Sequence, residues 1–330
     1  MNGSVLKGMN GAYLFFPDDE TTILSAGKFS FVYLGADLNT KKKCIIKRLH
    51  PKIETDKHAA IRFLAEANIR VNHPAIINTL DLIVQGNKRY MVQEFIPSIS
   101  LKELIRENIV LANHKLIANI SIKLLDAIQA MHEDGIIHRN IKPSNILIAY
   151  DTETNKINWN NPDVRLIDFE LSKTKDNIPV YTKHETRSPF SIVYSSPEIL
   201  LRQYDSLVNP ATDLYSIGLI IMEMYTGQPA FFTENPAKLI DMQLNKKIKQ
   251  PAKMYNHLFE IIQKATDKLP VQGSLQKIPN EVIIKILQEG IKLRYQTATA
   301  MRDDMISFLK DPGEKPKTKT SVIKKLLNKS

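Results

Sequence analysis

The sequence predicts an α+β protein of two lobes, a small β-rich lobe followed by a large helical lobe. Up to about Phe95 the chain carries short β-prone runs around one helical stretch, whereas helical spacing dominates after Pro97. Of the 330 residues, 43% are hydrophobic and 24% are charged, which is typical of a globular chain and not of a disordered or fibrous one. We therefore expect lobes over residues 1–96 and 97–311, and a basic tail over 312–330.

The small lobe is expected to hold three strands and one helix. Residues 31–34, 44–46 and 90–92 are β-prone, and a turn at 37–40 separates the first two runs. Residues 59–71 have helical spacing, because Phe63, Ala67 and Val71 lie on one stripe. These elements would form a sheet that a single helix covers.

The large lobe begins with a short helix opened by Leu101, Leu104 and Ile105. A long amphipathic helix is expected over residues 111–132, and short buried strands over 136–137 and 146–148. Beyond Pro197 nearly all of the sequence has helical character up to the tail.

Several classes of protein are excluded by simple counts. Apolar runs such as residues 219–222 are far shorter than the roughly 20 residues of a membrane helix, so no transmembrane segment is expected. The first 20 residues lack the apolar block of a signal peptide. The single cysteine, Cys44, cannot form an internal disulfide, and a reducing, cytoplasmic location follows as the expectation.

The net charge of +10 is concentrated at the C-terminal end. Residues 312–330 contain six lysines and one acid, Glu314, and so carry +5, which leaves +5 on the other 311 residues. A specific nucleic-acid-binding domain would more often cluster its basic side chains with aromatic ones. We interpret the tail as a solvated end. The alternative is a weak anchor on an anionic surface, through Ile323, Leu326 and Leu327 with the lysines.

Two segments carry residues suited to phosphate chemistry. Residues 138–147, HRNIKPSNIL, place Lys142 and Asn145 in a polar loop before a buried strand, and Asp168 follows a second apolar strand 23 residues after Asn145. Lys142 can neutralise a transferring phosphoryl group, while the oxygens of Asn145 and Asp168 are ligands that Mg²⁺ prefers. A carboxylate at the end of an apolar strand is costly unless it has such a role.

Together these segments resemble the eukaryotic-type Ser/Thr protein kinase family, over roughly residues 24–309. His138 to Asn145 is similar to the family's catalytic loop, and Asp168-Phe169-Glu170 to its metal-binding DFG element. Three further positions match residues that brace the family's large lobe: Glu198 of an APE-like element, Arg294 as its partner, and Asp213 as the anchor of the catalytic loop. The resemblance implies the bilobal protein kinase fold, with ATP and Mg²⁺ as cofactors and a protein as substrate or partner.

The resemblance also assigns the nucleotide-binding residues of the small lobe. Lys47 is similar to the strand lysine that pairs with the α- and β-phosphates, and Glu66 is the candidate for its helix partner. The hinge would lie at Glu94 to Ile96, whose backbone would bind adenine, with Gln93 as gatekeeper. The glycine-rich loop would contribute Ser25, Gly27, Phe29 and Val32.

Asn140 is the departure that bears most directly on chemistry, because the family has a catalytic aspartate there. An amide can orient a substrate hydroxyl but has no useful basicity. General-base help is typically worth 10²–10⁴-fold, or about 3–5 kcal/mol of barrier. Positioning and Mg²⁺ carry much of phosphoryl transfer, so Asn140 predicts severe impairment and not certain loss.

Two more departures concern the nucleotide and the metal ion, and a third concerns the partner of Lys47. Only Gly27 remains of the loop glycines, with Ser25 and Ser30 at the others, so nucleotide binding would be hindered but not excluded. Glu170 replaces the DFG glycine and would either add a Mg²⁺ ligand or repel phosphate.

Glu66 lies two residues nearer to His73-Pro74 than the family spacing, which is about 200° of helix. Two alternatives follow. Either the helix end is shortened and Glu66 pairs with Lys47, which we favour, or Glu66 faces solvent and Lys47 lacks this partner.

Three functional hypotheses follow. The first is a kinase-like domain that binds ATP and Mg²⁺, has reduced or absent phosphotransfer, and signals through a protein partner. The second is a working Ser/Thr protein kinase with an unorthodox loop, which the presence of Lys47, Lys142, Asn145 and Asp168 favours. The third is a nucleotide-free interaction module that uses the basic tail.

Overall fold

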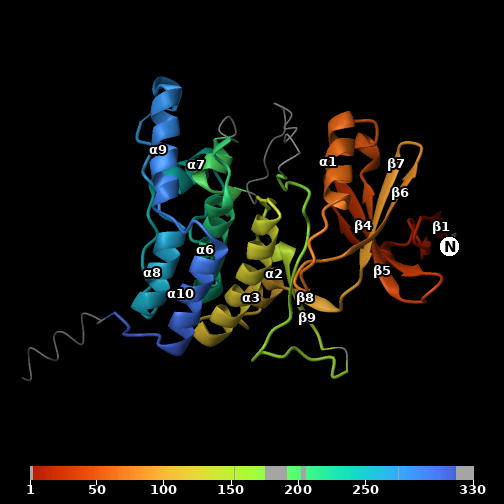
Figure 1. Cartoon of the computed structure of the whole chain (residues 1–330), viewed down its shortest axis with the longest axis horizontal. Helices are drawn as coiled ribbons and strands as arrows, with labels where there is room; N and C mark the ends of the chain where they lie inside the picture. Colours follow the sequence, from red (N-terminus) through yellow and green to blue (C-terminus); the bar gives the residue numbers. More distant parts are fainter. Residues whose placement is uncertain (1–2, 152, 175–191, 202–205, 274, 317–330) are drawn as a thin grey trace, which may run out of the picture.

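The computed structural model has a β-rich lobe and a helical lobe, and the chain passes between them near Phe95 (Figure 1). The structure describes residues 3–151, 153–174, 192–201, 206–273 and 275–316. The predicted bilobal α+β architecture is confirmed. Most of the basic tail, including Ile323, Leu326 and Leu327, lies outside the described residues.

The small lobe is a curled antiparallel sheet in the order β1-β2-β4-β5-β7-β6, with β3 paired to β4. Its strands are β1 (Ser4–Lys7), β2 (Ala12–Phe15), β3 (Ile23–Ala26), β4 (Ser30–Asp37), β5 (Lys43–Leu49), β6 (Thr79–Gln85) and β7 (Lys88–Glu94).

Side chains of β5 pack on both faces of the sheet. Cys44 and Ile46 are buried in one cluster with Tyr33 and Val92, and Leu49 is buried against helix α1 (Lys57–Ala67) on the other side. Cys44 is only 1% exposed. This two-sided packing fixes the register of β5.

Of these strands, only β4, β5 and β7 were predicted from the sequence. The hairpin β1–β2, which was not predicted, links the two ends of the sheet. The Asn10 N–H donates to Asp81 Oδ2 (2.9 Å) and the Tyr13 hydroxyl to the same oxygen (3.3 Å), while Asn10 Nδ2 donates to Leu80 O (2.7 Å). Leu80 and Asp81 belong to β6, the strand at the far end of the order. The sheet is therefore nearly closed on itself.

The end of one helix and one expected strand differ from prediction. Helix α1 ends at Ala67 and not near Val71, since Asn68 caps it and the following residues turn toward His73. Its start is set by Asp56, whose side chain accepts from the N–H groups of His58 and Ala59. The expected strand at 136–137 is reduced to one isolated bridge between Ile137 and Lys173.

The large lobe is built around α6 (Pro210–Thr226), whose residues are almost all buried. Before it come β8 (Ser98–Ser100), α2 (Leu101–Arg106), α3 (His114–Glu133), β9 (Ile146–Ala149), β10 (Val164–Leu166) and α5 (Pro197–Leu200). After it come α7 (Pro236–Asn245), α8 (Asn256–Ala265), α9 (Asn280–Lys292) and α10 (Ala298–Lys310). The predicted long helix is α3, which starts at His114 because Asn113 caps it.

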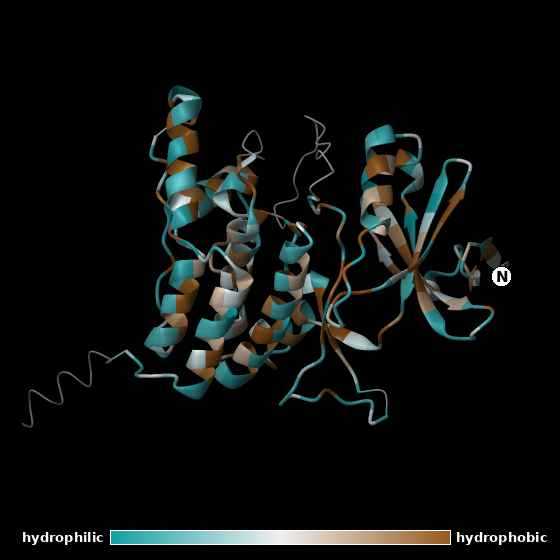
Figure 2. Cartoon of the chain, in the orientation of Figure 1, coloured by the Kyte–Doolittle hydropathy of each residue, from teal (hydrophilic) through white to brown (hydrophobic). Residues whose placement is uncertain are grey.

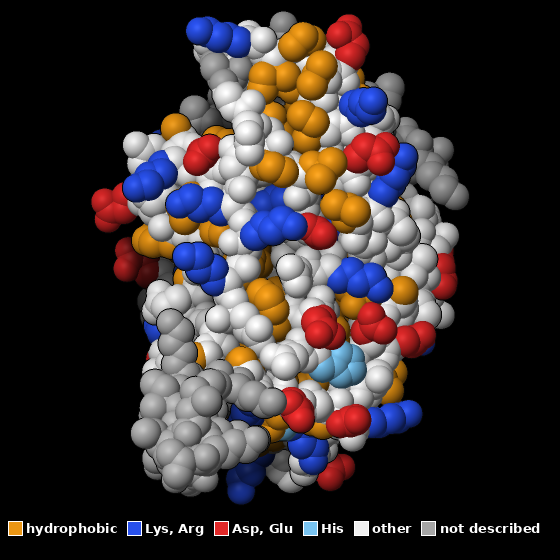
Figure 3. Space-filling model, turned by 90° about the vertical axis from the view of Figure 1, so that its left-hand side faces the viewer, with side chains coloured by type: hydrophobic (Ala, Val, Ile, Leu, Met, Phe, Trp, Pro, Cys, Tyr) orange, Lys and Arg blue, Asp and Glu red, His pale blue; other side chains and the backbone are white. Residues whose placement is uncertain are grey.

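The outer helices show the banded pattern of amphipathic surface helices, most clearly α9 (Figure 2). Leu269, Val282 and Ile286 line a shallow apolar groove on α9, and apolar side chains gather on this face (Figure 3). Within the part of the chain that the structure describes, no helix is long and apolar enough to cross a membrane.

Candidate functional site

A cleft of about 680 Å³ between the lobes collects the predicted nucleotide and metal residues. It is lined from the small lobe by the hairpin of β3 and β4, by β5 and by α1, and from the large lobe by the segments around β9 and Asp168. The predicted residues that line it are Ser25, Gly27, Phe29, Val32, Lys47, Glu66, Gln93, Glu94, Ile96, Lys142, Asn145 and Asp168. Asn140 lies beside the cleft, in a small adjoining cavity.

Lys47 lies between two carboxylates inside this cleft. Its Nζ is 2.8 Å from Glu66 Oε1 and 3.2 Å from Asp168 Oδ1. Burial opposes the charged ammonium, but Glu66, Asp168 and Glu170 outweigh it and raise the pKa of Lys47. The pairing of Glu66 is thus present. The helix ends early, so the family's helical count back from His73 does not apply.

The loop that carries Asn140 is anchored to α6 by a buried carboxylate. Asp213 Oδ2 accepts from the His138 N–H (2.9 Å) and Oδ1 from the Arg139 N–H (2.8 Å), and His132 Nε2 lies 2.9 Å from Oδ2. Burial alone would raise the pKa of Asp213, but these hydrogen bonds hold it below its usual value. The anchoring also holds Arg139 in a left-handed conformation with φ 63°.

Three side chains meet where phosphate chemistry would occur. Asn140 Nδ2 donates to Asp168 Oδ2 (3.1 Å), and so does Asn145 Nδ2 (3.1 Å). Asp168 is itself left-handed, with φ 67°. Lys47 on one oxygen and Lys142 nearby hold the pKa of Asp168 below its usual value despite its burial. Asp168 is therefore an anion surrounded by donors.

The large lobe is braced behind this loop by a buried ion pair. Arg294 Nη1 lies 2.8 Å from Glu198 Oε1 and 3.1 Å from Oε2, and the Thr212 hydroxyl donates to Oε1 (2.9 Å). Residues 96 positions apart are joined in this way without contact with the cleft. The two loops in their order along the chain, the pair of Lys47 with Glu66 and this buried ion pair all lie within the region that matches a known protein family.

Residues 19–306 match the family model described as the protein kinase domain. The chain belongs to the protein kinase family. The hairpin β1–β2 precedes the matched region.

Curated relatives are Ser/Thr kinases of bacteria. The chain is 29% identical over 292 residues to a probable serine/threonine-protein kinase of Clostridium perfringens, covering 87% of this chain and 37% of the relative. It is 28% identical over 296 residues to serine/threonine-protein kinase PknB of Mycolicibacterium smegmatis (86% and 41%), and 27% over 311 residues to PknB of Mycobacterium tuberculosis (90% and 44%). The chain spans less than half the length of these relatives.

The donor set of this kinase domain fits a magnesium ion. Asp168 offers an anionic carboxylate and Asn145 an amide oxygen, both hard ligands, at the inner end of the cleft. Rotation of the Asn145 amide would turn its oxygen toward the same side as Asp168. Glu170 lines the cleft as well, so a further carboxylate is near.

The hairpin that covers the cleft differs from the expectation for a glycine-rich loop. Ser25 and Ser30 lie in β3 and β4 and have no left-handed backbone, and Gly27 has none either. A Cβ on Gly27 would lie 3.3 Å from Ser30 O, so close packing and not conformation favours glycine there. The two serines therefore create no backbone strain.

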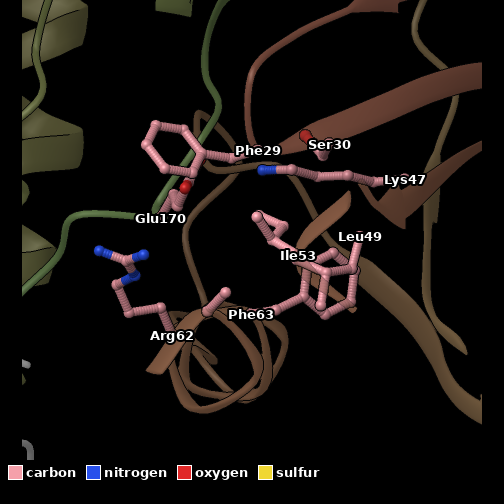
Figure 4. Close-up of a pocket in the computed structure, with 9 residues that line it drawn as sticks. Phe29, Ser30, Lys47, Leu49, Ile53, Arg62, Phe63 and Glu170 are labelled. Carbon is pink, nitrogen blue, oxygen red and sulfur yellow. The ribbon is translucent and has the colours of Figure 1, made fainter. Parts of the chain in front are cut away.

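A small cavity behind Lys47 lies between Phe29, Glu170 and helix α1 (Figure 4). The Phe29 ring lies 5.5 Å from the Arg62 guanidinium carbon, a cation–π contact that ties the hairpin to α1. Burial raises the pKa of Glu170 to about 7, although Lys47 opposes this. Both the repelling and the metal-ligating roles of Glu170 remain compatible with this position.

Sequence reasoning missed the apolar walls of the cleft, Ile45, Ile77, Leu147 and Ile167. A signal was available for two of them. Ile45 lies two residues before Lys47 on β5, and Leu147 lies two residues after Asn145, which directly precedes β9. Residues two apart along a strand share a face. Ile77 gave no such signal, because its segment is joined to Leu166 by backbone pairing across 89 positions.

Proposed function

We propose that this kinase domain binds ATP with Mg²⁺ in the interlobe cleft, transfers phosphate slowly or not at all, and acts through its conformation on a protein partner. Support for nucleotide binding comes from the gathered cleft residues and the charged Lys47. Support for signalling through a partner comes only from the weakened chemistry.

The contact from Asn140 Nδ2 to Asp168 Oδ2 carries the proposal of impaired transfer. At the position of the general base, the Asn140 amide nitrogen is a hydrogen-bond donor. It points at Asp168, the residue expected to hold the metal ion. It can accept a hydroxyl hydrogen bond through its oxygen but cannot take the proton. The reaction would lose its general-base contribution of about 10²–10⁴-fold.

The remaining groups would bind and orient the nucleotide. Lys47, fixed by Glu66, would face the α- and β-phosphates, and Lys142 would lie near the transferred group. The Glu94–Ile96 backbone would hold adenine between apolar walls. Asp168 and Asn145 would hold Mg²⁺, which supplies neutralisation of phosphate charge when bound.

A second candidate is an active Ser/Thr kinase. The pair of Lys47 and Glu66 favours it, because an ion pair buried in the cleft costs energy if it serves no reaction. In that case Asn140 would only orient the acceptor hydroxyl, and positioning would carry catalysis.

A thermal-shift titration with ATP, with and without Mg²⁺, tests the proposal. Mg·ATP at about 100 times its Kd should add roughly 2.7 kcal/mol to the free energy of unfolding and raise Tm by several degrees. ATP with a chelator should give less, because Asp168 and the phosphates then repel. Phosphotransfer to a basic protein should stay far below the usual 1–100 s⁻¹.

The variant for this test is the double change Lys47→Met with Glu66→Gln. Lys47→Ala alone would leave Glu66 buried and unpaired, at a cost of about 3–5 kcal/mol. The double variant should lose most of the shift, and the exposed Lys88→Ala on β7 should keep it. Absence of any shift at millimolar Mg·ATP would reject nucleotide binding and favour the interaction module. Ordinary transfer rates would reject the impairment.

A further inference from the structure

A buried chain of polar side chains runs from Lys268 to the segment beside Asn140. Lys268 Nζ donates to the Tyr215 hydroxyl (3.0 Å), which donates to Gln243 Oε1 (2.7 Å). The Gln243 amide nitrogen in turn donates to the carbonyls of Ile192 (3.3 Å) and Val193. Helices α6 and α7 and the segment that follows α8 are thus linked to one short loop, residues 192–195.

Lys268, Tyr215 and Gln243, which we call the relay, are costly to bury. Lys268 is 3% exposed, and Tyr215 and Gln243 are fully buried. Lys268 also lies 4.7 Å from the centre of the Phe231 ring. A lysine and a glutamine in an apolar cluster would normally be replaced by apolar residues unless their hydrogen bonds define a particular arrangement.

The loop that the relay holds lies next to the reacting position. Tyr194 and Ser195 line one small cavity together with Asn140 and Lys142. The Tyr194 carbonyl accepts from the Ser216 hydroxyl (2.8 Å), and its own hydroxyl donates to Glu223 (2.7 Å). Helix α6 therefore holds the second half of the loop, and Gln243 holds the first half.

We infer that Gln243, supported by Tyr215 and Lys268, is a positioning residue for the acceptor protein. Tyr194 and Ser195 line the cavity beside Asn140, so an acceptor whose hydroxyl reaches Asn140 would contact this loop, and the shape of the loop would affect how the acceptor segment is seated. The two carbonyls that Gln243 binds are turned inward, which fixes the direction of the following peptide groups. The part of this inference that concerns the acceptor protein rests on the proposed function, whereas its first test does not.

Amide hydrogen exchange over residues 193–195 in the nucleotide-free protein is that first test. Gln243→Met keeps the volume and removes both donors, so exchange there should rise about tenfold or more. Tyr215→Phe and Lys268→Met should give smaller increases at the same amides. Ser121→Ala removes an equally buried hydrogen bond in α3, to Ile117 O (2.7 Å), and should leave this loop unchanged.

A second readout uses the Asn140→Asp background with a basic protein as acceptor. The relay variants should raise the half-saturating concentration of the acceptor several-fold and leave that of ATP unchanged. Equal exchange changes in Gln243→Met and Ser121→Ala, or loss of affinity for ATP and acceptor alike, would overturn the inference. Exchange needs neither nucleotide nor transfer, so its result stands if the proposed function fails.

Discussion

Asn140 donates to a carboxylate that an aspartate at the same position would repel. Its amide nitrogen lies 3.1 Å from Asp168 Oδ2, and Lys47 occupies the other oxygen of Asp168. The site is therefore electrostatically satisfied by the protein alone. Such a site has less need of a metal ion to keep its shape than one in which two carboxylates face each other.

Asn140→Asp should therefore change both stability and rate. Without Mg²⁺ the new carboxylate would face Asp168 and lower Tm, and Mg²⁺ should restore it. Phosphate transfer to a basic protein should rise about 10²-fold or more, because the missing base is returned without a change of shape. A radiometric transfer assay and thermal melts with and without Mg²⁺ measure these effects.

Asn140→Ala is the matched control, since it removes the donor without adding a base and should give no gain. If Asn140→Asp also gives none, Ser25, Ser30 or Glu170 limits the reaction. Glu170→Gly in the same background is then the next change to make.

Lys268 makes stability depend on pH in an unusual direction. Burial, and then Arg294, lower its pKa to about 7, against 10.5 in the unfolded chain. Between these values the unfolded chain binds more protons than the folded one, so the free energy of unfolding rises with pH. Below about pH 7 Lys268 is protonated in both states, and the cost of burying its charge then lowers the free energy of unfolding by its full amount.

Urea unfolding of the wild type and of Lys268→Met at pH 6.5, 8 and 9.5 checks this expectation. The wild type should gain stability relative to the variant at each step, since other titrating groups cancel in the difference. A difference that stays constant across the three pH values would show that Lys268 titrates alike in both states.

At the scale of elements, the hairpin β1–β2 depends on a close approach at Gly8. A Cβ there would lie 2.0 Å from Asp81 Oδ2, the oxygen that already accepts from Asn10 and Tyr13. Burial and Asp81 raise the pKa of Tyr13 to about 12, so it remains a donor at any ordinary pH. The docking of the hairpin is thus specified by residues about 70 positions apart.

Gly8→Ala should undock the hairpin and cost about 1–3 kcal/mol, because the carboxylate cannot move without losing its donors. Limited proteolysis near residues 8–11 and thermal melting measure the effect. The neighbouring exposed Lys7→Ala should change stability by less than about 0.5 kcal/mol. Equal melting of the two variants would mean that the hairpin contributes little to the fold.

For the whole molecule, local patterns predicted the two lobes and the two polar loops, and the resemblance to the kinase family predicted the residues of the cleft. The missing parts depend on long-range contacts. Strands of four residues, such as β1 and β2, have too little pattern to be recognised alone, and they exist through pairing with β4 and through Asp81. The three links of the relay from Lys268 to Val193 span 53, 28 and 50 residues, and no local spacing marks them.

The buried position of Cys44 makes the chain convenient for spectroscopy. It is the only cysteine, it lies in the core of the small lobe, and burial raises the pKa of its thiol to about 11. Thiolate is the form that reacts with maleimides and iodoacetamides, so Cys44 should remain unlabelled in the folded state. Cysteines introduced on the surface, one on each lobe, would then be the only reactive thiols. A dye pair attached to them would report the opening and closing of the cleft without a cysteine-free background.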